Sequence, residues 1–339
     1  MAYYSGLLIY IWILYVLTSQ MKNKERGRKI FFIFVCLGVI LFQGFRSFTV
    51  GTDLASYIPS YFRIGVEDFY DFTYLNYEPG YVILNKILYQ MGVDERGFLI
   101  AIAAFVQIPI FYTLYRYSEW PILSILWYFT FGNFIFTFSG LRQSIAMAIC
   151  FLGYKFIKNK KFMHYFLVIL FASTFHSSAW FCLVLYPIYF VKLDRRKIFI
   201  ALGMLAMVYM LRSSIFAFLG RLYYEESISS MDTGAFTMFA VYVLMFILSF
   251  YKKKEETEYM GLRNILLILA MIYSFASMHT YVTRIGYPLS LYMTVFVPKL
   301  ANSFHVVPRW LYHSLCYAVL IAVFYYFLGG LNTLPFSFE

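Results

Sequence analysis

The feature that most constrains this chain is a succession of long apolar runs separated by short polar segments. Hydrophobic residues make up 62% of the 339 residues and charged residues only 13%, against about 45–50% and about 25% in soluble domains. The excess extends over the whole length instead of one anchor segment. Because backbone polar groups in lipid must be satisfied internally, we predict an all-α polytopic membrane protein, with 1–339 as one integral membrane domain.

The apolar runs predict about twelve transmembrane helices. The expected spans are 3–18, 30–45, 98–115, 122–138, 141–157, 162–175, 179–191, 198–211, 235–251, 262–278, 285–297 and 310–328. The run 79–93 falls short of the roughly 20 residues that a span needs, so we predict a re-entrant or interfacial segment. Together with the aromatic and acidic stretch before it, this run forms a predicted extracytoplasmic loop, 46–97, with interfacial helices.

Basic residues concentrate in short loops such as 22–29, 158–161 and 192–197. The positive-inside rule makes these loops cytoplasmic and places both termini outside. The first positive charges follow the first apolar run, which predicts a retained span and not a cleaved signal peptide. The net charge of +11 therefore reflects membrane topology and does not indicate nucleic-acid binding. The same topology places six polar residues at the outer face: Arg46, Asp53, Glu78, Arg142, His176 and Arg284.

Arg142 and Gln143 interrupt the apolar sequence FIFTFSGLRQSIAMAIC and form the strongest candidate site. An arginine so close to hydrocarbon is costly, so it marks a functional site by default. The small residues that follow permit close helix packing, and free N–H groups at a helix start favour an anion. Snorkelling to the interface is the alternative for this arginine and also for Arg46 and Arg284.

Two carboxylates are further candidates. Asp53 follows Arg46 within the same short polar segment, and can orient it, accept a proton from a sugar hydroxyl, or cap a helix that begins near Leu54. Glu78 precedes Pro79 and is either a helix-start carboxylate favoured by the helix dipole or a group at the mouth of the re-entrant segment. In the second case, Asn85 would lie on the same helix face.

His176 lies in the polar run STFHSSAW, which suggests a broken helix that lines a cavity. It is either a structural, hydrogen-bonded residue or a general base near neutral pH. His279, in MHTYVTR, is a weaker version of the same pattern. No motif for a metal, a nucleotide or a serine nucleophile is present, and the four cysteines lie in apolar runs without paired spacing. We therefore expect no cofactor and no metal.

Four segments together resemble the EpsG family of Wzy-type polysaccharide polymerases. They are GFRSFTVGTDLASY (44–57), EPGYVILN (78–85), SGLRQSIAMAI (139–149) and FHSSA (175–179). The resemblance implies a metal-independent, inverting glycosyltransferase of the GT-C type in a bacterial cytoplasmic membrane. It would join undecaprenyl-diphosphate-linked oligosaccharide repeat units into capsular or exopolysaccharide at the outer face.

This resemblance suggests a role for each candidate residue. Arginines suit a diphosphate, so Arg142, Arg46 and Arg284 are expected to bind it as it leaves. His176 is the first choice for the base, followed by Asp53 and Glu78. The residues expected to bind sugar are Gln143, Asn85, Tyr57 and Tyr81. The expected partners are the lipid-linked glycan, membrane lipid, and flippase and chain-length regulator proteins.

Three other functions compete with this hypothesis. A flippase of the lipid-linked unit would need polar residues along a path through the bilayer, whereas here they concentrate at one face. A glycan ligase would use the same chemistry as a polymerase, and the sequence does not separate the two. A membrane acyltransferase acting through His176 would need its acyl donor to arrive from the inside, against the predicted topology.

Overall fold

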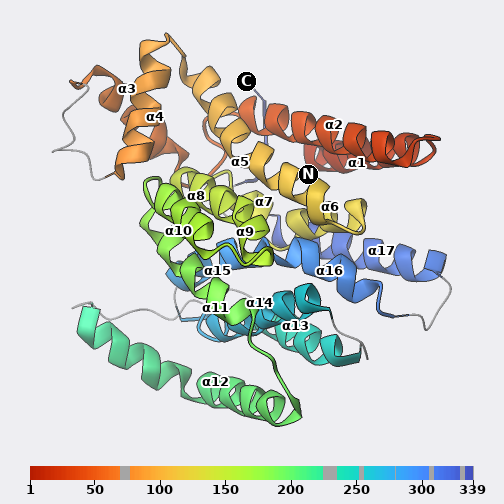
Figure 1. Ribbon diagram of the computed structural model, residues 1–339. Coiled ribbons are helices and arrows are strands. Elements are labelled where there is room, and N and C mark those ends of the chain that lie inside the picture. The colour runs from red at the N-terminus through yellow and green to blue at the C-terminus, as the bar shows by residue number, and fades with distance from the viewer. Residues whose placement is uncertain are drawn as a thin grey trace. The chain divides into compact units, whose positions relative to one another are not determined.

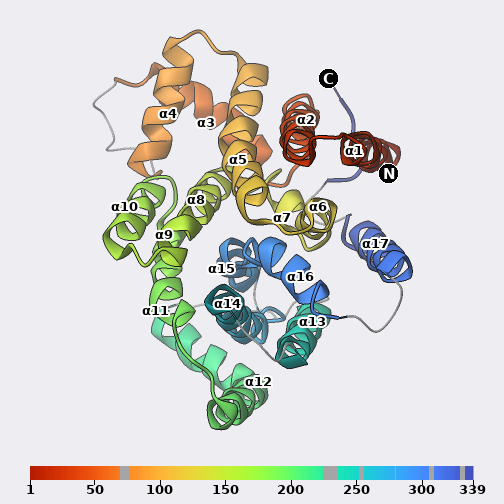
Figure 2. The same cartoon turned by 45° about the vertical axis from the view of Figure 1, so that its right-hand side comes forward.

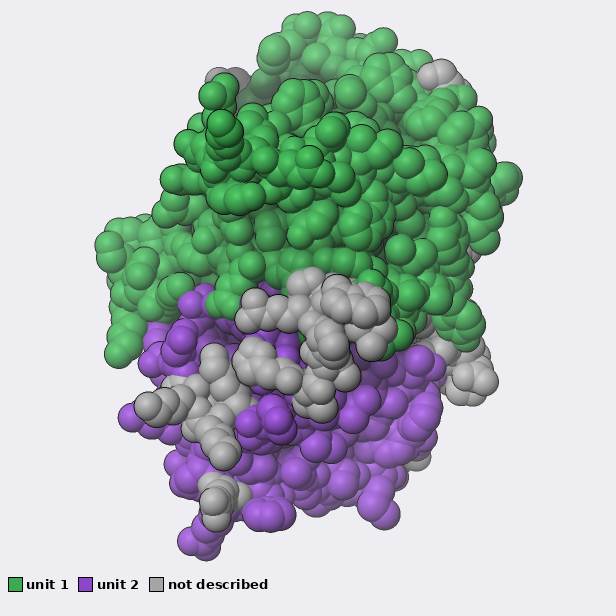
Figure 3. Space-filling model, turned by 90° about the vertical axis from the view of Figure 1, so that its right-hand side faces the viewer, with its two compact units in different colours: residues 1–180, 306–339 green, residues 181–305 purple. Residues whose placement is uncertain are grey.

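The computed structural model describes residues 1–68, 77–223, 235–251, 256–278, 280–304, 309–328 and 333–338. Within these ranges the regular elements are helices, and one isolated antiparallel bridge pairs Arg46 with Phe338. The chain divides into two units, which Figure 3 colours separately: unit 1, Met1–Trp180 with Val306–Glu339, and unit 2, Phe181–His305.

Unit 1 carries the N-terminal helices and the last one. They are α1 (Ala2–Ser19), α2 (Lys24–Gly44), α3 (Leu54–Val66), α4 (Pro79–Gln90), α5 (Glu95–Tyr117), α6 (Pro121–Thr130), α7 (Asn133–Phe136), α8 (Leu141–Leu152), α9 (Tyr154–Lys158), α10 (Phe162–Ser173) and α17 (Arg309–Phe327). A 3-10 helix, η1 (Ser177–Val184), crosses into unit 2. The other elements of unit 2 are α11 (Leu185–Tyr189), α12 (Arg195–Tyr223), α13 (Ala235–Leu248), η2 (Ser249–Tyr251), α14 (Thr257–Tyr273), α15 (Thr280–Ser290) and α16 (Met293–Ala301).

Among the described residues, 4 helices are long and apolar enough to cross a membrane: α1, α2, α5 and the part of α12 from Arg196 to Phe218. Several shorter apolar helices of 10–17 residues accompany them. The prediction of an all-α, multi-pass membrane protein is therefore confirmed. The predicted count of about twelve spans and the GT-C type of architecture stay predictions.

Helices α1, α2 and α5 form an antiparallel group (Figures 1 and 2). At the start of α2, the Arg28 guanidinium donates a hydrogen bond to the Tyr115 carbonyl near the end of α5, at 2.6 Å. At the start of α5, Arg96 donates to the Gly44 carbonyl at the end of α2, at 2.8 Å. Each arginine thus satisfies a carbonyl at the C-terminus of the neighbouring helix, which has no partner within its own helix.

Four of the predicted spans are not single continuous helices. The run 122–138 is divided into α6 and α7 at Gly132, whose φ of +79° lies in the left-handed region that glycine adopts without steric cost. The run 141–157 is divided into α8 and α9 by a turn at Gly153. The runs 179–191 and 285–297 are likewise composite, the first of η1 and α11 and the second of α15 and α16. Hydropathy predicted these segments as apolar but did not predict where each helix stops.

The polar segment after α2 contains two helices that pack against each other (Figure 1). The amphipathic α3 buries Tyr57, Tyr61 and Ile64. Helix α4 has 12 residues, so it is about 18 Å long and shorter than the roughly 30 Å of a bilayer's hydrocarbon core. The predicted helix in this segment is therefore present, and its place at the interface stays a prediction.

The loop between α2 and α3 is fixed against the residues just before α8. Gly51 has a φ of +119°, and a Cβ there would collide with the Phe138 carbonyl oxygen. The Thr52 N–H donates to Ser139 Oγ at 2.9 Å. The C-terminal segment also holds this loop, because the Ser47 N–H donates to the Ser337 carbonyl at 2.9 Å. The start of α8 therefore lies near the C-terminal end of α2, whereas the basic turn 20–23 and the first residues of α2 lie at the other end.

A buried polar network joins α2, α5, α6 and the turn before α8. The Gln43 amide donates to Thr137 Oγ1, and the Gln107 amide donates to Gln43 Oε1 at 2.8 Å. The Tyr128 hydroxyl completes the network by donating to Gln107 Oε1 at 3.0 Å. All four side chains are almost fully buried. Hydrogen bonds between helices in an apolar setting stabilise packing and fix its register.

We expect Gln43→Leu and Gln107→Leu each to lower the free energy of unfolding by about 1–3 kcal/mol, because each leaves a buried polar partner unsatisfied. The double variant should lose less than the sum, since both changes remove the same hydrogen bond. Thermal unfolding of the purified protein in detergent measures both effects. Gln20→Leu, at an exposed position, is the control and should change little. Strictly additive losses would show that the two glutamines do not cooperate.

Candidate functional site

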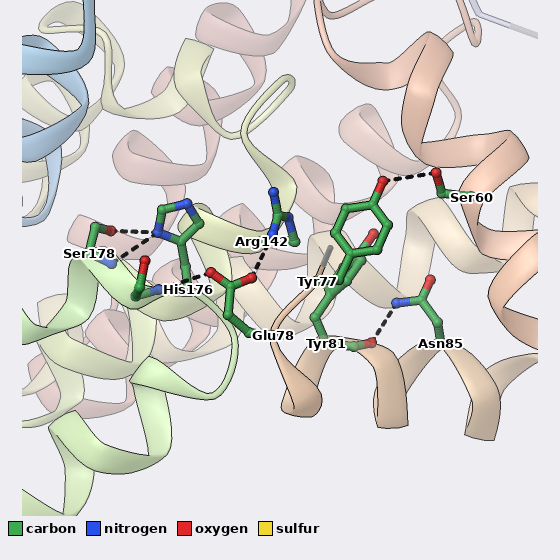
Figure 4. A network of polar contacts seen from close by, with 9 residues as sticks. Ser60, Tyr77, Glu78, Tyr81, Asn85, Arg142, His176 and Ser178 are labelled. Atoms are coloured by element: carbon green, nitrogen blue, oxygen red, sulfur yellow. Dashed lines mark hydrogen bonds and ion pairs between the residues drawn. The ribbon is translucent and has the colours of Figure 1, made fainter. Parts of the chain in front are cut away.

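The centre of the candidate site is an ion pair between Glu78 and Arg142 (Figure 4). Arg142 Nη1 lies 2.5 Å from Glu78 Oε2, and each side chain is about one-fifth exposed, at 21% and 20%. The second carboxylate oxygen, Oε1, accepts a hydrogen bond from the Ser177 N–H at 3.0 Å. One carboxylate thereby joins the start of α4, the start of α8 and the turn after α10.

The backbone around Glu78 brings these segments together. Glu78 is extended, and Pro79 begins α4 at a position where proline suits the helix. The Gly80 N–H donates to the Thr174 carbonyl at 2.8 Å. A Cβ on Gly80 would lie 2.8 Å from that carbonyl oxygen and closer still to Thr174 Oγ1. The approach of α4 to the turn after α10 thus depends on glycine at position 80.

Three tyrosines surround the guanidinium. Arg142 Cζ lies 4.6 Å from the centroid of the Tyr77 ring, in the geometry of a cation–π contact. The Tyr77 hydroxyl is 2.9 Å from Ser60 Oγ on α3. The Tyr77 and Tyr57 rings both pack edge-on against Tyr81, with centroids 5.7 and 6.0 Å away. Burial raises the pKa of Tyr57, although the nearby Arg142 charge acts in the opposite direction.

Several buried polar atoms here have no hydrogen-bond partner within the described ranges. They are Arg142 Nε, Tyr81 Oη, Asn85 Oδ1 and Ser144 Oγ. The Asn85 amide nitrogen, in contrast, donates to the Tyr81 carbonyl at 2.6 Å. Buried polar atoms almost always find a partner, in the protein or in bound water or ligand. A ligand with polar groups would therefore find hydrogen-bond partners in these atoms.

His176 forms its own hydrogen-bonded turn beside Glu78 (Figure 4). The Ser178 N–H donates to His176 Nδ1 at 3.1 Å, and Ser178 Oγ lies 2.8 Å from the same nitrogen. Because Nδ1 accepts the backbone N–H, the neutral ring carries its proton on Nε2. The ring therefore offers a donor through Nε2, whereas a general base needs a nitrogen that can accept a proton.

Arg46 has a different environment from Arg142. It is 2% exposed, and its guanidinium donates to the carbonyls of Val50, Gln43 and Phe138 at 3.1, 3.1 and 3.0 Å. These three bonds close the loop between α2 and α3 and attach it to the segment before α8. Through these contacts Arg46 stabilises the backbone of the α2–α3 loop and of the segment that leads to Arg142.

The remaining candidates are more dispersed. Asp53 precedes α3 and is half-buried, and its side chain does not make the helix-capping hydrogen bond that was one of its predicted roles. Gln143 is buried on α8. Arg284 lies on α15 in unit 2 and is half-buried, whereas the residues around the Glu78–Arg142 pair belong to unit 1. His279 lies outside the described residues.

The structure thus brings together Glu78, Arg142, His176, Tyr57, Tyr81 and Asn85 from the predicted set. Sequence analysis missed Tyr77, Ser177 and Ser178 as parts of the site. Tyr77 precedes Glu78, and the two serines follow His176. Their position next to predicted site residues was the only sequence feature that pointed to them. Within the described ranges, no three His, Cys, Asp or Glu side chains gather as metal ligands would. The N–H donors present suit an oxyanion.

Fold and site together describe a helical multi-pass membrane protein with a partly buried arginine–glutamate pair surrounded by tyrosines. The chain matches the EpsG family over residues 29–338, and it therefore belongs to this family. The predicted resemblance is confirmed, and membership indicates a role in polysaccharide biosynthesis. No curated protein and no solved structure matches the chain.

Proposed function

We propose that this protein polymerises undecaprenyl-diphosphate-linked oligosaccharide repeat units at the outer face of the cytoplasmic membrane. The observation that carries the proposal is the Glu78–Arg142 pair, which holds a guanidinium in a partly buried, tyrosine-lined site. A guanidinium binds phosphate oxygens in a planar, directional way and keeps its charge at any physiological pH. Family membership supports a glycan-linked substrate.

The charge distribution supports a site at the outer face. Lys22, Lys24 and Arg26 lie at the turn between α1 and α2 and at the start of α2, which makes that end cytoplasmic by the positive-inside rule. The hydrogen bond from Thr52 to Ser139 links the opposite end of α2 to the segment before Arg142. A substrate that carries its own diphosphate leaving group suits this face, because the energy for the new linkage arrives with it.

In the proposed reaction, the anomeric carbon at the end of the growing chain exchanges its bond to a diphosphate oxygen for a bond to a hydroxyl oxygen of the incoming repeat unit. The bond to the lipid diphosphate breaks, and its electron pair leaves with the diphosphate. A hydroxyl of the incoming repeat unit forms the new carbon–oxygen bond and gives its proton to a base. Arg142 binds the diphosphate and stabilises its developing charge. Glu78 and Tyr77 are positioning residues that orient the guanidinium.

The hydrogen bonds of the site lead us to revise the roles of the acid–base candidates. His176 was the first choice for the base, but its Nε2–H suits donation to a diphosphate oxygen. Glu78 is engaged through both oxygens with Arg142 and Ser177. Asp53 also makes contacts in the structure, and its charge acts on Tyr57, which neighbours Arg142. We propose it as the base because of this position.

The sugar rings are proposed to lie against the tyrosines. Tyr57 and Tyr81, both buried in this structure, keep their proposed role because an aromatic face packs well against the apolar face of a sugar. Asn85 Oδ1 and the Tyr81 hydroxyl, which lack partners among the described residues, would pair with sugar hydroxyls. Gln143 follows Arg142 on α8 and is proposed as a further sugar contact. Arg46 is proposed to act indirectly, through the loop it closes, and Arg284 keeps its proposed role as a diphosphate ligand.

We expect Arg142→Ala to lower polymerisation by about 10²–10³-fold, as the loss of a charge-stabilising donor does in other enzymes. Arg142→Lys should recover little, because an ammonium does not reproduce the paired contacts of a guanidinium. The measurement is the ladder formed from purified lipid-linked repeat units at matched protein levels. Arg63→Ala changes an exposed arginine on α3 and is the control. Full activity in Arg142→Ala would refute the diphosphate role.

The roles of His176 and Asp53 can be separated by conservative changes. His176→Gln places an amide N–H near the position of Nε2 and should keep a measurable part of the activity, whereas His176→Ala should lose about 10²-fold. Asp53→Asn should lose activity almost completely, because an amide accepts no proton. Initial rates in the same assay decide the assignment. If His176→Gln were as inactive as Asp53→Asn, the donor role of the histidine would be wrong.

Deletion of the gene in its host tests the reaction itself. A polymerase predicts loss of the long glycan ladder on gels, with a single repeat unit accumulating on its lipid at the outer face. Long chains that remain on lipid would instead indicate a ligase. Repeat units trapped at the cytoplasmic face would indicate a flippase. Complementation with the wild-type gene is the control for effects on neighbouring genes.

A further inference from the structure

An apolar groove lies between α2 and α5, away from the Glu78–Arg142 pair. Its volume is about 520 Å³, within the range of about 300–1,000 Å³ that ligand sites occupy. The residues that line it include Phe32, Cys36 and Leu37 on α2 and Ile108, Phe111 and Tyr112 on α5. All belong to unit 1. This surface is therefore complete within one compact unit.

The groove has a buried floor and exposed walls. Phe32 and Phe111 are 3% and 2% exposed, whereas Leu37 and Ile108 are 47% and 55% exposed. In a bilayer, these walls face the hydrocarbon of the lipids. The side chains that line an unfilled groove lack dispersion contacts on one side unless a lipid chain occupies the groove. Its shape and apolar lining thus suit an acyl chain.

One end of the groove is positively charged. Lys29 lines that end and is exposed, and the adjacent Arg28 is held on the Tyr115 carbonyl. From Lys29 to Ile40, the lining residues of α2 cover about 16 Å along the helix axis. That length is about half of the roughly 30 Å hydrocarbon core. The groove therefore spans one leaflet, with its cation at the interface of the cytoplasmic side.

We propose that this groove binds one acyl chain of an anionic phospholipid from the cytoplasmic leaflet, with the headgroup phosphate at Lys29. Anionic headgroups are attracted to basic residues at the membrane surface, and the basic end of α2 supplies that charge. The diphosphate of the proposed glycan substrate belongs at the opposite end of α2, near Arg142. The lipid site is thus separate from the glycan site and does not depend on the proposed reaction.

Native mass spectrometry of the purified full-length protein tests the charge selectivity. The protein is titrated with phosphatidylglycerol or phosphatidylcholine that carry identical acyl chains. The wild type should retain phosphatidylglycerol in preference, and Lys29→Ala should weaken that binding about fivefold while leaving phosphatidylcholine unchanged. Lys22→Ala removes an exposed lysine that does not line the groove and should keep the preference. An unchanged preference in Lys29→Ala would overturn the proposal.

Photo-crosslinking tests the location, first on the wild type. Phosphatidylglycerol with a diazirine in the middle of one chain should label peptides that contain Cys36, Leu37 or Ile108. Leu37→Trp fills the groove and should lower this labelling, whereas Ile13→Trp, at an exposed position of α1, should not. Labels spread outside α2 and α5 would overturn the proposal. The proposal would also be overturned if the protein formed a dimer through the groove and Leu37→Trp dissociated that dimer.

Discussion

The candidate site depends on the two contacts that the Glu78 carboxylate makes. A guanidinium at the start of an apolar helix is stable only with a partner, because an unpaired buried charge is costly. Glu78 supplies that partner to Arg142 and uses its second oxygen for the Ser177 N–H. The same residue thus neutralises a charge and joins three segments, while the Tyr77 ring lies 4.6 Å from the guanidinium carbon. A site built in this way is held in place by the protein's own contacts.

Arg142 and Glu78 could each be selected from the sequence because charges are rare in an apolar chain. Their pairing could not, since they are 64 positions apart and the contact depends on how the fold brings the starts of α4 and α8 together. The helical, multi-pass class followed from hydropathy, because apolar runs of span length have few other stable forms. The breaks at Gly132 and Gly153 did not follow from it, because hydropathy reports which segments are apolar and not the backbone angles at which a helix ends.

Arg46 and His176 show a second limit of sequence reasoning. Arg46 and Arg142 both lie beside apolar runs, yet Arg46 bonds to three backbone carbonyls. Every residue carries a carbonyl, so no side-chain pattern distinguishes a loop-closing arginine from one that pairs with a carboxylate, as Arg142 does. For His176, the contact that the sequence does not reveal is with a residue only two positions away. The Ser178 N–H, two residues along, engages Nδ1 and thereby sets which nitrogen carries the proton, a choice that residue type alone leaves open.

The charges at the start of α2 require an explanation beyond helix stability. Lys24, Arg26, Arg28 and Lys29 lie in its first turns with a single carboxylate, Glu25, although the helix dipole disfavours cations there. Arg28 offsets part of this cost by binding carbonyls at the end of α5, where the dipole favours a cation. Lys29 is exposed beside the groove. A pattern that opposes the helix's own dipole is best explained by the membrane, because basic residues at this end fix the orientation of α2 and attract anionic lipid. In the orientation that the positive-inside rule predicts, the opposite end of α2, and with it the segment leading to Arg142, faces outward.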